Sequence, residues 1–327
     1  MTDTEKITVS SIDELKKYGM TDISVAIGVF DGVHAGHRRL LEELITLASV
    51  TSSVPVAVTF SPHPRQILFP DHAPELLLPP EEKQKRLFQS GVRAIVTIPF
   101  DRAFAALPPE RFIAETLSPA GSGLRGVCVG THWRFGAGGS GDTVLLTRLA
   151  DQYGFLFRAV DEVEGEGETV SSSAIRNAAQ HGDLSKAARY LGRPYTLYGK
   201  VIHGEGVASS RLDCPTANID VCAGVLPPNG VYAARVILAD GKKENAIVNI
   251  GAAPTFNSYG IKDLRRVEAH LLSGCGCDLY GDDLAVELIA FLRSEQKFSG
   301  VDALKTQIAL DIKQTLTILE ERKEEQG

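Results

Sequence analysis

The sequence predicts two domains of different fold class: an α/β doubly wound domain followed by a mostly antiparallel β-barrel with a C-terminal helix. The chain has 327 residues, which corresponds to two domains at roughly 150 residues each. In the first half, short β-branched runs alternate with helical patterns, as parallel strands joined by crossover helices do. Beyond about residue 196, strand-like runs follow one another, separated by Gly, Pro and Asn, which is typical of a small barrel.

The first half contains five strand-like runs with helical patterns between them. The predicted strands cover residues 23–29, 54–60, 94–98, 127–129 and 156–160. Helical spacing of Leu40, Leu41, Leu44, Ile45 and Ala48 predicts the first crossover helix, and further helices are predicted from Pro80, over 108–117 and over 142–153. Ligands of doubly wound sheets bind beyond the carboxyl ends of the strands, so the loop after the first strand is the first candidate site.

The second half begins between Gly182 and Thr196, and we divide the chain into domains 1–185 and 186–327. Predicted strands cover residues 197–202, 231–238, 246–250, 266–272 and 284–292. A final helix is indicated by the capping pair Ser299 and Asp302 and by an apolar stripe formed by Leu304, Ile308, Ile312, Leu316 and Leu319. The acidic stretch 162–168 is predicted to be a solvated, mobile loop.

Charge and composition limit the class of partner. The 34 Lys and Arg against 41 Asp and Glu give a net charge of −7, which disfavours nucleic acid or an anionic membrane as the main partner. A small anion remains compatible, because local cations and backbone N–H groups can hold a phosphate. No apolar run approaches the roughly 18 residues of a membrane span, and no secretory signal is visible. With five cysteines, the sequence predicts a cytoplasmic protein that acts on small molecules and leaves its oligomeric state open.

The most informative motif joins the first predicted strand to its helix. Residues 28–37 read GVFDGVHAGH. The glycines allow the backbone to approach a bulky anion, and the helix N-terminus directs N–H groups and positive dipole toward it. His34 and His37 would donate hydrogen bonds to a phosphoryl group in the transition state. The alternative is a capping turn with two surface histidines, but the full strand–turn–helix pattern favours phosphate chemistry.

This segment resembles the F-D-G-x-H-x-G-H loop of the bacterial bifunctional riboflavin kinase/FAD synthetase family. Downstream segments are also similar to family motifs: TFSPHPR at 59–65, LPPEEK at 78–83, FAALPPERF at 104–112, GTHWRFG at 130–136 and SSSAIR at 171–176. Ser61, Ser173 and the pair His132-Trp133 stand where the family usually has Asp, Thr and Asn-Phe. The resemblance continues from about Gly28 to the terminal helix.

For residues 1–185 the resemblance implies a nucleotidyltransferase-like fold and FMN adenylyltransferase (FAD synthetase) activity. His34, His37 and Arg176 are its expected catalytic residues. The expected ATP and flavin contacts are Gly28, Phe30, Asp31, Gly32, Gly36, His63, His132, Ser172 and Ser173. Three local alternatives stay open from the residues themselves: Ser171 to Ser173 as a helix cap, His63 as a structural turn residue, and Trp133 as a core side chain.

For residues 186–327 the resemblance implies riboflavin kinase activity. The segment PTAN at 215–218 is expected to bind Mg²⁺ and the ATP phosphates through Thr216 and Asn218, and Mg²⁺ prefers such hard oxygen ligands. Glu268 is the expected general base for the ribityl hydroxyl, although an exposed strand carboxylate is the alternative. Gly204 and Arg293 are expected to contact nucleotide or flavin.

The predicted function is therefore phosphorylation of riboflavin to FMN by ATP, followed by adenylylation of FMN to FAD with release of pyrophosphate. The alternative is FMN adenylyltransferase activity alone with a degenerate kinase barrel, because Asp213 and Cys214 replace a usual Gly and aromatic residue. A class I aminoacyl-tRNA synthetase is disfavoured by the short, acidic chain, and a non-catalytic flavin-binding regulator by the retained Glu268 and histidine pair. Cys275 and Cys277 are expected to be free thiols rather than zinc ligands.

Overall fold

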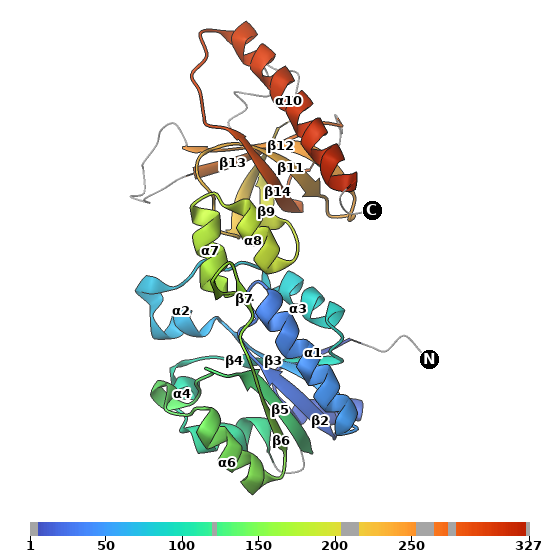
Figure 1. Ribbon diagram of the computed structural model, residues 1–327, viewed down its shortest axis with the longest axis vertical. Coiled ribbons are helices and arrows are strands. Elements are labelled where there is room, and N and C mark those ends of the chain that lie inside the picture. The colour runs from blue at the N-terminus through green and yellow to red at the C-terminus, as the bar shows by residue number, and fades with distance from the viewer. Residues whose placement is uncertain (1–5, 120–122, 204–215, 253–264, 274–278, 325–327) are drawn as a thin grey trace. The chain divides into compact units, whose positions relative to one another are not determined.

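The computed structural model describes residues 6–119, 123–203, 216–252, 265–273 and 279–324. Contacts within the chain divide it into two units (Figure 1). The first unit is Met1–Pro74 with Pro80–Ser171, and the second is Glu75–Pro79 with Ser172–Gly327. The predicted fold classes are confirmed: the first unit holds a parallel α/β sheet and the second a closed antiparallel barrel with a terminal helix. Among the helices of the described residues, none has the length and apolar character needed to cross a membrane.

A six-stranded parallel sheet forms the first unit, with the strand order β1-β4-β3-β2-β5-β6. Its strands are β1 (Ile7–Val9), β2 (Ile23–Ile27), β3 (Val54–Ser61), β4 (Ala94–Pro99), β5 (Leu124–Gly130) and β6 (Leu156–Val160). β2 and β3 lie at the middle of the sheet and are apolar along most of their length, as strands covered on both faces are. β1 is an addition to the predicted set.

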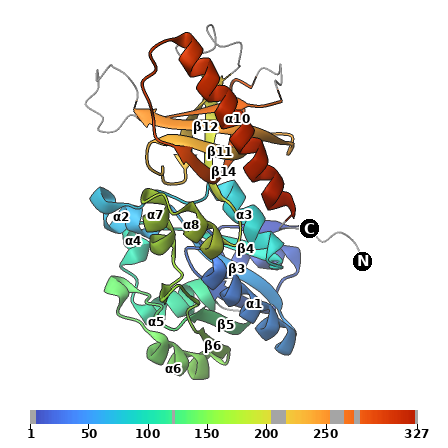
Figure 2. The same cartoon turned by 45° about the horizontal axis from the view of Figure 1, so that its top comes forward.

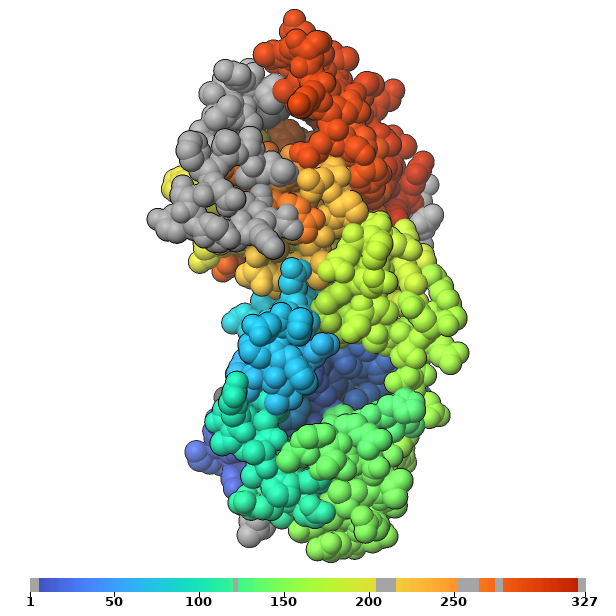
Figure 3. Space-filling model, turned by 90° about the vertical axis from the view of Figure 1, so that its left-hand side faces the viewer, coloured from blue at the N-terminus to red at the C-terminus, as the bar shows by residue number. Residues whose placement is uncertain are grey.

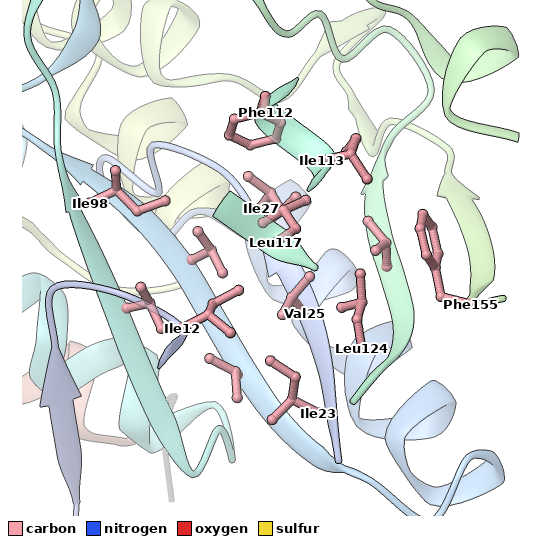
Figure 4. Packing of buried hydrophobic residues seen from close by; sticks show 14 of the residues in the cluster. Ile12, Ile23, Val25, Ile27, Ile98, Phe112, Ile113, Leu117, Leu124 and Phe155 are labelled. Carbon is pink, nitrogen blue, oxygen red and sulfur yellow. The ribbon is translucent and has the colours of Figure 1, made fainter. Parts of the chain in front are cut away.

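Helices cover both faces of this sheet. α1 (Ala35–Val50) packs on β2, β3 and β5 through a face that includes Leu41, Leu44 and Leu47. The core on the other face joins Ile23, Val25 and Ile27 of β2 to side chains of η3 and α6 (Figure 4). The remaining helices are η1 (Asp13–Tyr18), α2 (Pro64–Leu68), η2 (Pro70–His72), α3 (Pro80–Gln89), α4 (Arg102–Ala105), α5 (Pro109–Arg111), η3 (Phe112–Leu117), η4 (Ala137–Gly139) and α6 (Thr143–Tyr153).

The acidic stretch 162–168 differs from the prediction. It forms a two-stranded antiparallel hairpin of β7 (Glu164–Gly165) and β8 (Glu168–Thr169) rather than an irregular loop. Its two central residues, Glu166 and Gly167, both have positive φ, 54° and 80°. Short hairpins favour this pair of conformations because it matches the twist of their strands. The loop prediction was therefore wrong in its secondary structure.

In the second unit, the strands close in the order β10-β13-β12-β11-β14-β9, and all described pairings are antiparallel. They are β9 (Tyr195–Ile202), β10 (Thr216–Ala223), β11 (Gly230–Ile237), β12 (Lys243–Ala252), β13 (Arg265–Leu271) and β14 (Asp283–Arg293). Pairing of β9 with β10 closes the barrel, which removes free sheet edges. The helices α7 (Ser172–Gln180) and α8 (Leu184–Leu191) pack on each other, and α8 packs on β9 and β14.

The last helix, α10 (Val301–Glu324), lies across β11, β12 and β14 (Figures 1 and 2). The predicted apolar stripe is confirmed at Leu319, which is 1% exposed, but is wrong at Leu316. Leu316 is 38% exposed, whereas Asp311 and Thr315 are 3% and 0% exposed. The packed face therefore passes through Asp311 and Thr315 to Leu319, at spacings of four residues. Asp311 is buried in this face because its carboxylate pairs with Arg293 of β14.

Candidate active sites

The loop after β2 carries the first candidate site, and its backbone is unusual. Phe30 and Val33 have φ values of 55° and 42°, and Gly32 between them has 84°. Non-glycine residues rarely adopt this left-handed region, and each such residue costs about 1–3 kcal/mol and persists only where its surroundings hold it there. Such strain is concentrated at functional sites in proteins. The loop therefore has a fixed, costly shape at the carboxyl end of the central strand.

The two predicted histidines meet at the start of α1. His34 is the N-cap residue, is 6% exposed, and its Nδ1 accepts a hydrogen bond from the backbone N–H of His37 at 3.4 Å. The two imidazole rings are stacked, with centroids 3.6 Å apart. Gly36 makes this possible, because a Cβ there would lie 3.3 Å from the His34 ring. The histidines are thus a stacked pair at a helix N-terminus, not two separate surface residues.

His37 has the features of a binding group. Its Nδ1 is buried and has no hydrogen-bond partner within the described residues. Burial lowers the pKa of His37 well below its usual value, and the positive charges of Lys83 and Arg38 and the neighbouring His34 add to the effect. The ring is therefore neutral at pH 7, with an unused nitrogen. An unpartnered buried nitrogen of this kind is expected where a ligand completes the hydrogen bonding.

Lys83 is a charged residue of this site that the sequence did not single out. Its Nζ donates to the carbonyl oxygen of Val29 at 3.4 Å and to Oγ1 of Thr59 at 3.3 Å. The Thr59 hydroxyl in turn donates to the same carbonyl at 3.0 Å. Burial lowers the pKa of Lys83, and the charge of Asp31 partly offsets this. Its position at the end of the LPPEEK segment, on α3, was the one feature of the sequence that could have indicated this role.

The other predicted contacts of the first unit have varied surroundings. Asp31 is buried, at 4% exposure. Gly28 lies under the Phe30 ring, where a Cβ would approach to 3.3 Å. His132 is exposed, and His63 caps α2, its Nδ1 accepting from the N–H of Arg65 at 3.1 Å. In Figure 3, dark blue atoms from the start of the chain lie recessed between the cyan and green surfaces of the same unit.

The structure answers the local alternative for Trp133 and places three other predicted residues on α7. Trp133 stacks on Phe135, with centroids 4.7 Å apart, and packs against the core, so the core alternative describes it. Ser172, Ser173 and Arg176 lie on α7, which the chain contacts group with the second unit. There the Nε of Arg176 donates to the carbonyl of Glu75 at 2.7 Å. The predicted adenylyl-transfer residues are thus divided between the two units.

The second candidate site is a cavity of about 320 Å³ between the barrel strands and α10. This volume is within the roughly 300–1,000 Å³ range of small-molecule sites. Its polar lining includes Thr216, Asn249, Glu268 and His270. Its apolar lining includes Val231, Ile247, Phe298, Leu304 and Ile308. An apolar wall with a few polar groups on one side suits a flat aromatic ligand that carries a polar chain.

Strand register brings the polar groups of this cavity together. Asn218 on β10 is the direct partner of Glu268 on β13, and Glu268 is also the partner of Asn249 on β12. Thr216 is the partner of His270. Directly paired residues of antiparallel strands share one face, so Glu268 has an amide on each side. The Glu268 carboxylate forms no hydrogen bond or ion pair within the described residues, which leaves it available to a ligand.

Arg293 lies in the wall of the cavity and is tied to α10. Its Nε and Nη2 donate to the two carboxylate oxygens of Asp311 at 2.8–3.1 Å. Gln307 donates to the same carboxylate at 2.9 Å, and the guanidinium lies over the Phe298 ring. The side chains of Arg293 and Asp311 are 16% and 3% exposed. This buried fork fixes the helix over the cavity.

Comparison with known proteins assigns the family. A family model described as FAD synthetase matches residues 17–174, and one described as riboflavin kinase matches residues 191–319. The bifunctional riboflavin kinase/FMN adenylyltransferase of Escherichia coli (strain K12) is 35% identical over 303 residues, covering 93% of this chain and 95% of the relative. That of Bacillus subtilis (strain 168) is 31% identical, covering 88% and 89%. This chain belongs to the bifunctional riboflavin kinase/FMN adenylyltransferase family. The predicted resemblance is confirmed.

A solved structure supports the fold over nearly the whole chain. The crystal structure of a protein from Streptococcus pneumoniae, described as a macrolide-efflux protein, is 26% identical. It covers 95% of this chain and 98% of its own, with a TM-score of 0.79. The chain thus has the same domain folds as that protein.

Both activities of the bifunctional family use ATP, and the predicted Mg²⁺ residues have the donor atoms that suit that ion. Thr216 and Asn218 are two apart on β10 and so share a face, and they offer a hydroxyl and an amide oxygen beside the Glu268 carboxylate. Hard oxygen donors of this kind fit Mg²⁺. Among the described residues, no three His, Cys, Asp or Glu side chains form a metal cluster. Gly204, Asp213, Cys214, Cys275 and Cys277 lie outside the described residues.

Proposed function

We propose that this chain makes FMN and FAD in two separate sites. It is a transferase that phosphorylates riboflavin in the barrel cavity and adenylylates FMN at the histidine loop. The observation that carries the proposal is the coexistence of two unlike constellations in one family member. One is a carboxylate, Glu268, flanked by amides in an apolar cavity. The other is a neutral, stacked histidine pair at a helix N-terminus.

In the kinase step, riboflavin places its isoalloxazine against the apolar wall that includes Phe298 and Ile308. Glu268 takes the proton of the terminal ribityl hydroxyl as that oxygen attacks the γ-phosphorus of ATP, and ADP leaves. Thr216 and Asn218 would hold Mg²⁺, which would supply neutralisation of the negative charge on the phosphates. Arg293 lines the flavin pocket while its bonds to Asp311 keep α10 in place. Gly204 is proposed as a further contact to the nucleotide.

In the adenylyl step, a phosphate oxygen of FMN attacks the α-phosphorus of ATP and pyrophosphate leaves. No protein nucleophile is required, so positioning and charge stabilisation supply the catalysis. His34 and His37 donate hydrogen bonds to phosphoryl oxygens, and the N-terminus of α1 adds its dipole. Arg176, with Ser172 and Ser173, is the proposed binding group for the leaving pyrophosphate. The proposed contacts to ATP and flavin are Gly28, Phe30, Asp31, Gly32 and Gly36 of the loop, together with His63 and His132.

The proposal includes the domain limits and the setting of the protein. Residues 1–185 form the FMN adenylyltransferase domain and residues 186–327 the riboflavin kinase domain. The protein acts in the cytoplasm on small molecules and not on nucleic acid. The presence of both family matches favours two activities over the alternative of an adenylyltransferase with a degenerate barrel.

Product identity tests the proposal. Purified protein is incubated with Mg²⁺ and ATP together with riboflavin, and separately with FMN, and the flavins are separated by chromatography. The proposed function requires FMN and then FAD from riboflavin. FAD formed only from added FMN would establish the single-activity alternative, and neither product from either substrate would overturn the proposal.

A further inference from the structure

The strained loop after β2 has a cation bound to a carbonyl at each of its ends. Before the first strained residue, Phe30, the carbonyl of Val29 accepts from Lys83 at 3.4 Å. At the second strained residue, the carbonyl of Val33 accepts from Nη1 of Arg38 at 3.2 Å. A residue persists in this backbone region only when its surroundings determine its conformation. These two cations are therefore part of what holds the histidine pair in place.

Lys83 differs from Arg38 in where it comes from. Arg38 is on α1, directly after the loop, whereas Lys83 reaches the loop from α3, 54 residues further along the chain. On its way it also binds Thr59 of β3. Lys83 thus ties three elements of the first unit together at the end of the central strand. Because the Thr59 hydroxyl donates to the same carbonyl, the three groups form a closed triangle of hydrogen bonds.

The positive charge of Lys83 also interacts with two titratable groups of the loop and of α1. The buried carboxylate of Asp31, in the loop itself, interacts favourably with the ammonium group. Its positive charge also lowers the pKa of His37, in addition to burial of the ring and the effects of His34 and Arg38. Glu82 and Arg86, the charged neighbours on α3, are paired with each other at 2.6 Å. Lys85, on the same helix, is 64% exposed, and its Nζ lies 3.6 Å from a carboxylate oxygen of Glu82.

We propose that Lys83 is a positioning residue for adenylyl transfer, holding the carbonyl of Val29 so that His34 and His37 stay at the site of the transferred phosphoryl group. This inference rests on the proposed function of the histidine loop. Lys83 acts through the loop and the histidine pair and does not contact the reacting atoms. Its removal should therefore reduce turnover more than substrate binding, because misplacement of about 1 Å at a catalytic group costs up to 10²-fold in rate.

The test compares Lys83→Met with Lys85→Met and measures both activities of each variant. Lys83→Met is expected to lower kcat for FAD formation from FMN by about 10- to 100-fold, with KM for FMN changed by less than about threefold. Lys85→Met is expected to behave as the wild type. Riboflavin phosphorylation is expected to continue in both variants. If the proposed function is wrong, the wild type itself forms no FAD. If only the inference about Lys83 is wrong, the wild type forms FAD and Lys83→Met forms it equally fast.

A second readout excludes a purely structural role. The removal of a positive charge eases protonation of a neighbouring imidazole, so the pKa of His37, followed by NMR, should rise in Lys83→Met and stay constant in Lys85→Met. If Lys83→Met does not fold, Lys83→Arg decides: retained charge and donors should keep FAD formation within about tenfold of wild type. An unchanged kcat together with an unchanged His37 titration in Lys83→Met would overturn the proposal, as would inactive, folded Lys83→Arg.

Discussion

The two candidate sites are built in opposite ways. The histidine loop is made by the backbone: strained residues, glycines and a helix N-terminus occupy ten consecutive positions, 28–37. The barrel cavity is made by side chains from five strands, the segment after β14 and a helix, with Thr216, Asn249, Glu268 and Asp311 far apart along the chain. The first site therefore depends on the shape of one loop. The second depends on strand register and on the docking of α10.

Substitution of Glu268 tests the division of labour most directly. Glu268→Gln keeps the shape of the side chain but removes the base, so FMN formation from riboflavin is expected to fall by about 10²- to 10⁴-fold. FAD formation from added FMN is expected to continue, because the histidine loop is untouched. Asp220→Asn, at an exposed position of β10, is the matched control. Equal loss of both activities in folded Glu268→Gln would contradict the separation of the sites.

The link between β14 and α10 gives the next largest effect, on stability. Asp311→Ala leaves the guanidinium of Arg293, only 16% exposed, without its carboxylate. Breaking one side of a buried ion pair costs about 3–5 kcal/mol, whereas replacing both sides by apolar residues costs much less. The free energy of unfolding, measured in urea, should thus fall more in Asp311→Ala than in Arg293→Met/Asp311→Leu.

Glu320→Ala, at an exposed position of α10, controls for loss of a carboxylate from the same helix. It should leave the free energy of unfolding close to that of the wild type. A double variant that is less stable than Asp311→Ala would show that the pair is not the reason for the burial of Asp311.

The histidine loop should show the reverse selectivity. His34→Ala removes a stacked ring, a donor to phosphate and the N-cap of α1. FAD formation is expected to fall by about 10²- to 10³-fold, and loss of the cap should cost about 1 kcal/mol of stability. Riboflavin phosphorylation should be preserved. His72→Ala, exposed in the same unit, is the control, and FAD formation at the wild-type rate by His34→Ala would remove this histidine from the site.

The same contrast explains what could be predicted from the sequence. A site built on consecutive residues is visible as a motif, so the loop and its histidines were found before the structure. Lys83 was missed because its role arises only when α3 packs beside β3 and the loop. Asp311 was missed because the helical periodicity selects apolar residues, and its burial depends on Arg293, 18 residues earlier. Such pairings are tertiary and have no local pattern.

The fold shows a similar limit. Strands with apolar β-branched runs were located within a few residues, since both local preference and burial favour them. β1 has three residues and β10 begins with the polar residues of the PTAN segment, so neither has a clear pattern. The β7–β8 hairpin is rich in Glu, a poor strand former, and its turn is set by Gly167. Their pairing partners, not their composition, make these segments strands.

The smallest expected effect is a pH dependence confined to the histidine loop. In the folded protein, burial and nearby positive charge hold the pKa of His37 below its unfolded value of about 6.5. Below that pH the unfolded chain binds more protons than the folded chain, so stability falls as pH falls. Wild-type protein should therefore lose stability between pH 7.5 and pH 5.5 more steeply than His37→Gln, measured by urea unfolding. His72→Gln, at an exposed position of the same unit, should follow the wild type. Parallel curves for wild type and His37→Gln would mean that His37 titrates alike in both states, and the histidine pair would then not be a desolvated, neutral group.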